Sequence, residues 1–113
     1  MYTASALARD AISAFTQTLG RQNKLPGDCL ATADVLRAMI EERVSEGLIV
    51  VPYGAMNLAA ALVSGIEGTF RFLQDSAARG QMADDAPRVM RRRVIGTLEA
   101  EEAAGRLVFL ETQ

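Results

Sequence analysis

A cluster of four arginines is the most concentrated group of chemically active side chains in the sequence: Arg88, Arg91, Arg92 and Arg93. Arg88, Arg91 and Arg92 are spaced i, i+3 and i+4, so on a helix they form one ridge. Guanidinium groups bind phosphates and carboxylates through paired hydrogen bonds, so this ridge is a candidate for binding a partner protein or a nucleic acid. It can equally be a solvated face that pairs with glutamates on a neighbouring helix. The glutamates available for that pairing are Glu41, Glu42 and Glu46.

A second group of charged side chains, near the end of the sequence, consists of glutamates: Glu99, Glu101 and Glu102. Carboxylate metal sites in helical bundles usually add a histidine to each pair of glutamates, and the sequence has no His. Catalytic triads that depend on histidine are absent for the same reason. We expect Glu102 instead to pair with Arg106, four residues later on a helix. The sequence therefore predicts no catalytic residue, no metal site and no cofactor.

The only cysteine, Cys29, has no partner for an intramolecular disulfide and no histidine to act as its base. A single unpaired cysteine suits a reducing compartment, and the N-terminus lacks the basic segment of a signal peptide. We therefore expect a cytoplasmic protein, of bacterial type. Its net charge of −2 and pI of about 5.1 exclude a protein that is cationic as a whole. Contact with nucleic acid would have to come from a local patch such as the arginine ridge.

Apolar residues at helical spacing predict four helices that together position these groups. The first covers residues 4–19, with Thr3 or Ser5 as its cap, and a loop follows over residues 21–31. The second begins after its cap, Thr32, and ends before Gly47, with an apolar stripe at Val35, Leu36, Met39, Ile40 and Val44. The third runs from residue 55 to about residue 79, and the fourth runs from an aspartate cap at residues 84–85 to the glycine at position 105.

Two apolar tetrads, at residues 48–51 and 107–110, each follow a glycine that ends a helix. Their β-branched and aromatic residues favour short strands, and the two could pair as a small ribbon. The fold class we predict is all-α, in a single domain over residues 1–113. The architecture is a four-helix antiparallel bundle or an interlocked helical dimer, with one or two short strands.

Residues 47–66 carry no formal charge, which raises the question of a membrane span. Pro52 and Asn57 oppose insertion, and the helical pattern continues beyond the window into charged residues, so we expect a buried helix and no membrane contact. Small residues recur four apart on this helix, which permits close approach of another helix, either the first helix or the same helix of a second copy. The residues are Ala60, Ser64 and Gly68 on one line, and Ala61 and Gly65 on the other.

A homodimer formed through these small residues would cover the apolar surface that four short helices can barely surround. We therefore expect a non-catalytic interaction module, of adaptor, regulator or chaperone type, that self-associates and docks a partner protein on an apolar helical groove. Arg88, Arg91 and Arg92 would steer the partner by charge. The residues expected to anchor it are Phe70, Phe72 and Phe109. Two alternatives stay open: a regulator that contacts nucleic acid through the arginine ridge, and a small-molecule-binding or enzymatic domain that uses carboxylates.

Overall fold

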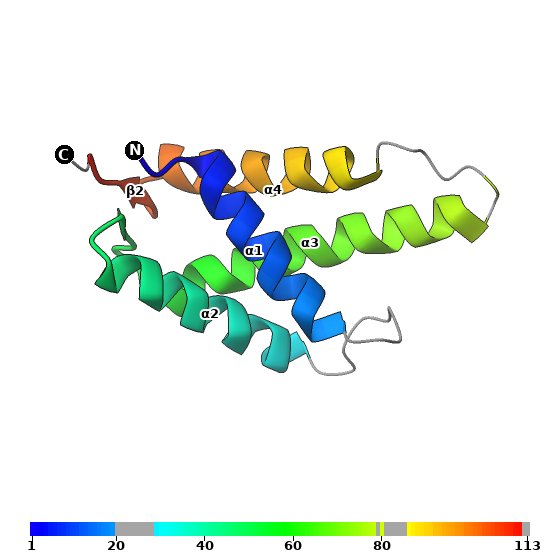
Figure 1. Cartoon of the computed structure of the whole chain (residues 1–113), viewed down its shortest axis with the longest axis horizontal. Coiled ribbons are helices and arrows are strands. Elements are labelled where there is room, and N and C mark those ends of the chain that lie inside the picture. Colours follow the sequence, from blue (N-terminus) through cyan, green and yellow to red (C-terminus); the bar gives the residue numbers. More distant parts are fainter. Residues whose placement is uncertain (20–28, 79, 81–85, 112–113) are drawn as a thin grey trace.

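The computed structural model describes residues 1–19, 29–78, 80 and 86–111. Four helices pack against one another and two short strands close one end, which confirms the all-α bundle expected from the sequence (Figure 1). The elements are α1 (Ala4–Leu19), α2 (Cys29–Ser45), β1 (Ile49–Val50), α3 (Ala55–Ala78), α4 (Ala86–Ala103) and β2 (Val108–Phe109). The aspartate cap expected at residues 84–85, and most of the loop expected over residues 21–31, lie outside the described residues.

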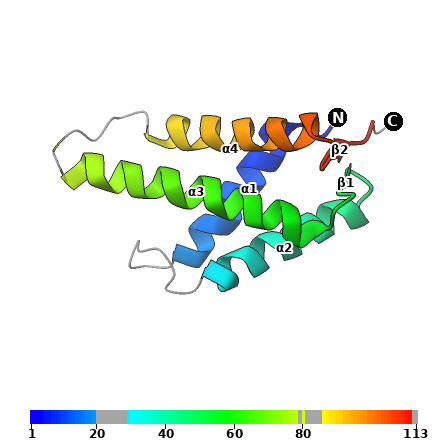
Figure 2. The ribbon, with the colours of Figure 1, turned by 180° about the vertical axis from the view of Figure 1, so that it is seen from behind.

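Each helix packs most extensively against two others, so the four form a closed ring around the core. Helix α1 packs against α2 and α4, and α3 packs against the same two helices. Figure 1 shows α1 crossing in front of α3, and Figure 2 shows α3 and α4 running antiparallel with α1 behind them. One face of the α3–α4 pair therefore lies on the side of the molecule away from α1.

The core is built from the apolar stripes that the spacing predicted. Helix α3 buries Leu58, Leu62 and Ile66, which follow one another at four-residue intervals. The other helices bury matching stripes, as expected from their 3.6-residue period. Their members are Leu7, Ala8, Ala11 and Phe15 in α1, Leu36, Met39 and Ile40 in α2, and Met90, Val94 and Leu98 in α4.

Helix α2 differs from its prediction in its first residue and in the burial of its apolar stripe. It begins at Cys29, so Cys29 is its first residue and Thr32 lies inside it. The prediction of Thr32 as the cap was wrong, because an alternative capping residue earlier in the chain is compatible with the same downstream pattern. Val35 and Val44, expected on the apolar stripe, are each 38% exposed.

At one end of the bundle the two apolar tetrads pair as an antiparallel ribbon, with Ile49 opposite Phe109 and Val50 opposite Val108. The amide of Leu110 also donates to the carbonyl of Leu48, at 3.0 Å. The glycines that precede the tetrads, at positions 47 and 105, have φ values of 76° and 79°. This left-handed conformation is the one that ends a helix most readily with glycine, as the sequence predicted.

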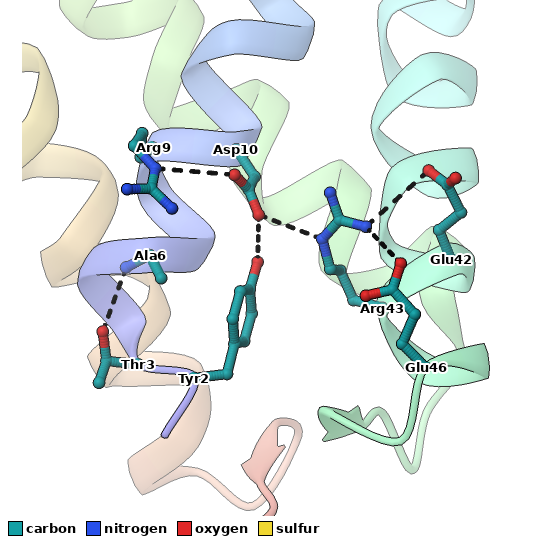
Figure 3. A network of polar contacts seen from close by, with 8 residues as sticks. All are labelled: Tyr2, Thr3, Ala6, Arg9, Asp10, Glu42, Arg43 and Glu46. Carbon is teal, nitrogen blue, oxygen red and sulfur yellow. Dashed lines mark hydrogen bonds and ion pairs between the residues drawn. The ribbon is translucent and has the colours of Figure 1, made fainter. Parts of the chain in front are cut away.

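A polar network fastens the N-terminus and α1 to α2 (Figure 3). The hydroxyl of Tyr2 donates to Oδ2 of Asp10 at 2.5 Å, and Nε of Arg43 donates to the same oxygen at 3.1 Å. Nη1 of Arg43 also reaches Oε1 of Glu46, at 3.0 Å. The Tyr2 ring in turn lies 6.4 Å from that of Phe109, so this one side chain connects the ribbon with two helices.

Candidate functional site: a glycine-lined groove between helices α3 and α4

A groove of about 610 Å³ runs between α3 and α4. Its lining residues are Gly65, Gly68, Thr69 and Phe72 from α3, and Val89, Arg92, Arg93, Gly96, Thr97 and Ala100 from α4. Small residues predominate along the floor, and the two arginines and the phenylalanine lie toward the end where α4 begins. This arrangement offers a shallow, mainly apolar bed with positive charge at one end.

At Gly65, the absence of a side chain lets α3 lie close to α4 along the groove. A Cβ added at Gly65 would lie 2.9 Å from Oγ1 of Thr97 on α4. That hydroxyl donates to the backbone carbonyl of Arg93, at 3.1 Å, so it is held in place on α4. The close approach that the small-residue spacing predicted at Gly65 is thus made with α4, within one chain, whereas the sequence pattern suggested the first helix or a second copy.

Gly68 and Gly96 have no such explanation within the chain. A Cβ added at either position would meet nothing within 4 Å, and both residues are exposed. Neither has the positive φ that would require glycine. Glycine inside a helix lowers stability by about 1 kcal/mol relative to alanine, so each weakens its helix without relieving any contact inside the molecule. Both residues line the same groove, from opposite walls.

The four clustered arginines are all exposed on α4 but differ in their contacts. Nη2 of Arg91 donates to Oγ of Ser5, at 3.0 Å, which ties it to the start of α1. Arg92 and Arg93 border the groove, and Arg88 is exposed on the preceding turn of α4. Within the described parts of the chain, Arg88, Arg92 and Arg93 make no ion pair. The glutamates expected to neutralise the ridge lie on α2 or directly after it, where Glu41 instead binds Arg37 and Glu46 binds Arg43.

Of the three phenylalanines proposed as anchors, the structure places only Phe72 at the groove, with 60% of its surface exposed. Phe70 lies on the inner side of α3, where its ring meets that of Phe15 edge-on with centroids 5.9 Å apart. Phe109 belongs to the ribbon, against Tyr2. Spacing alone could not separate these roles, because all three residues fit an apolar face of some element.

The small residues predicted along α3 divide between two surroundings. Ala60, Ser64 and Gly68 are exposed, so this line of small side chains faces solvent in the single chain. Ala61 and Gly65 are half-buried. The exposed line therefore extends the apolar bed along α3 beyond the groove.

One of the carboxylates near the chain end, that of Glu101, makes a structural contact. Glu101 is buried and accepts two hydrogen bonds from the guanidinium of Arg106, at 2.6 Å and 3.2 Å. The expected pair between Glu102 and Arg106 was wrong, because the chain has left the helix by Arg106 and its amide bonds back to the Glu101 carbonyl. Among the described residues, no three His, Cys, Asp or Glu side chains are placed to hold a metal ion.

Five groove residues were not identified from the sequence pattern: Thr69, Val89, Gly96, Thr97 and Ala100. The available signal was a glycine in the middle of a helix otherwise rich in charged side chains. A single glycine does not reveal which face it occupies, so only the placement of α3 beside α4 gives Gly96 a role.

None of the helices, over the residues that the structure describes, combines the length and the apolar character that a membrane-spanning helix needs.

Comparison of the chain with protein-family models, with curated proteins and with solved structures finds no match to any of them.

Proposed function

We propose that the protein is a non-catalytic interaction module of the cytoplasm, of adaptor, regulator or chaperone type, which binds a helix of another polypeptide in the α3–α4 groove. The observation that carries this proposal is the pair Gly68 and Gly96. At both positions a helical glycine stands where an added Cβ would meet nothing, and both glycines line one groove, Gly68 from α3 and Gly96 from α4. Residues without side chains let a second backbone approach closely, which would use the space that they leave open.

The lining indicates what kind of helix fits. The floor accepts small or apolar side chains, because Gly68, Gly96 and Ala100 present no polar side-chain groups. Arg92 and Arg93, which have no ion pair among the described residues, favour a helix with a carboxylate at that end. The exposed ring of Phe72 adds apolar area that binding would cover.

The proposal is tested by filling the groove. Gly68→Leu and Gly96→Leu place a branched side chain on the floor and suit a helix, so both variants should fold as judged by circular dichroism. The matched control is Ala38→Leu, at an exposed position on α2 beside α1. The chain is immobilised and exposed to extract from its own source organism. We expect a polypeptide, either a second copy or another protein, that is retained by wild type and by the control but lost with both groove variants. Retention that is equal for all four proteins would refute the proposal.

The alternative of nucleic-acid binding draws support from the exposed Arg88, Arg92 and Arg93, which make no ion pair in the described residues. It predicts retention on heparin at low salt that Arg92→Ala combined with Arg93→Ala abolishes, because each phosphate contact contributes to the salt dependence. No retention of the wild-type protein at low salt would exclude it.

A further inference from the structure

We infer that the helix seated in the groove is α4 of a second copy of this chain, crossing antiparallel at Gly96 about a twofold axis. This inference rests on the function proposed for the groove and names its occupant. It assigns to Gly96, Arg92 and Glu99 a joint role that none of them has inside one molecule.

Opposite charges lie on either side of Gly96 along α4. Arg92 lies four residues before Gly96 and Glu99 lies three residues after it, and all three are exposed. Residues spaced by four and then three share one face of a helix. With a rise of 1.5 Å per residue, Arg92 stands about 6 Å before the crossing point and Glu99 about 4.5 Å after it. The two side chains are therefore nearly equidistant from Gly96.

An antiparallel copy reverses this order. Arg92 of one copy then lies beside Glu99 of its partner, and the twofold axis repeats the same pair on the other side of the crossing. Such an interface is self-complementary, as an isologous contact must be. Parallel crossing at Gly96 would instead place like charges together, so the charge pattern selects the antiparallel arrangement.

These two charges have no partner among the described residues of the single chain. Neither Arg92 nor Glu99 makes an ion pair or a side-chain hydrogen bond with the described residues. The remaining surface fits a close crossing as well. A Cβ added at Gly96 would meet nothing within 4 Å, Ala100 follows one turn later, and Gly68 lies on the opposite wall. A helix seated there would also cover part of the exposed ring of Phe72.

Charge reversal tests the pairing in a way that separates it from other dimers. Arg92→Glu and Glu99→Arg each convert both intermolecular pairs into like-charge contacts. We expect each to raise the dimer Kd at least about tenfold in sedimentation equilibrium. An equimolar mixture of the two variants should regain the dimer as a heterodimer, because each copy then offers the charge that the other lacks. The double variant Arg92→Glu with Glu99→Arg should regain it as a homodimer.

Matched controls carry the same charge changes away from the groove, namely Arg9→Glu on α1 and Glu111→Arg after β2, and should leave the Kd unchanged. The inference is overturned if wild type stays monomeric up to near-millimolar concentration, if neither reversal weakens the dimer, or if the mixture fails to restore it. Groove-dependent retention of a different protein by a monomeric chain would overturn this inference and leave the proposed function standing. If wild type neither self-associates nor retains any polypeptide through the groove, both this inference and the proposed function are overturned.

Discussion

At the scale of single residues, three helical glycines differ in what surrounds them. Gly65 is required by the chain itself, since Thr97 occupies the space that a side chain would need. Gly68 and Gly96 face open space in the same groove. If evolution keeps them for contact with another helix, stability of the single chain and strength of association must respond to substitution in opposite directions.

Alanine substitution should show this opposition. We expect Gly68→Ala and Gly96→Ala each to raise the free energy of unfolding of the dilute monomer by about 0.5–1 kcal/mol, through helix propensity, while weakening association. Gly65→Ala should gain less or lose stability, because the Thr97 hydroxyl must leave its hydrogen bond with the Arg93 carbonyl. Urea unfolding at low protein concentration measures the first effect and sedimentation the second. Equal stabilisation by all three substitutions would show that the contact with Thr97 imposes no constraint.

We expect the carboxyl group of Asp10 to make the free energy of unfolding depend on pH. Burial of its carboxyl group raises its pKa, but hydrogen bonds from Tyr2 and Arg43, together with the charges of Arg43 and Arg9, lower it by more. The pKa of Asp10 thus lies below its ordinary value of 3.8. A carboxyl group with a lowered pKa stabilises the fold above its unfolded-state pKa, and this contribution is lost as the pH falls through the folded-state pKa.

The substitution Asp10→Asn removes the titrating carboxyl group and with it this dependence of stability on pH. The variant should be less stable than wild type at neutral pH, and the difference should shrink as the pH is lowered below about 4. Unfolding by urea over a series of pH values measures it. Glu111→Gln, which removes an exposed carboxyl group outside this network, is the control. A difference that stays constant with pH would mean that the network contributes no charge-dependent stability.

At the scale of elements, local signals were sufficient for most of the fold. The four helices and the ribbon follow from i, i+3 and i+4 apolar spacing and from the glycines at positions 47 and 105, all of which act within a few residues. The start of α2 was misplaced, because several residues before its apolar stripe are compatible with a helix. The groove could not be predicted from the sequence, because it depends on which faces of α3 and α4 pack together. Long-range packing decides which faces meet, and the same packing separated Phe72 from Phe70.

The ribbon should depend on its buried residues and not on its exposed ones. Leu107 is fully buried, whereas Val108, the next residue, is 42% exposed. We expect Leu107→Ala to lower the free energy of unfolding by about 2–4 kcal/mol through the cavity it leaves, and Val108→Ala by less than about 1 kcal/mol. Thermal or urea unfolding compares them. Similar losses from the two substitutions would contradict the packing of the ribbon on the helices.

At the scale of the whole molecule, the ring of four helices buries one core, and no described element covers the outer face of the α3–α4 pair (Figure 2). That face combines the open glycines, an exposed phenylalanine and charges without partners in the described residues. A second copy seated antiparallel on α4 would cover these features together. Self-association is therefore the use we propose for this face, with the charge order along α4 setting its direction.

A cross-link between copies tests this most directly. An antiparallel crossing at Gly96 brings residue 96 of one copy next to residue 96 of the other, within the separation of roughly 4.4–6.8 Å between Cα atoms that a disulfide spans. In a Cys29→Ser background, Gly96→Cys should form a covalent dimer readily under mild oxidation, whereas Ala38→Cys on α2 should not. Cross-linking of the position-96 variant no faster than that of the position-38 control would contradict the antiparallel crossing.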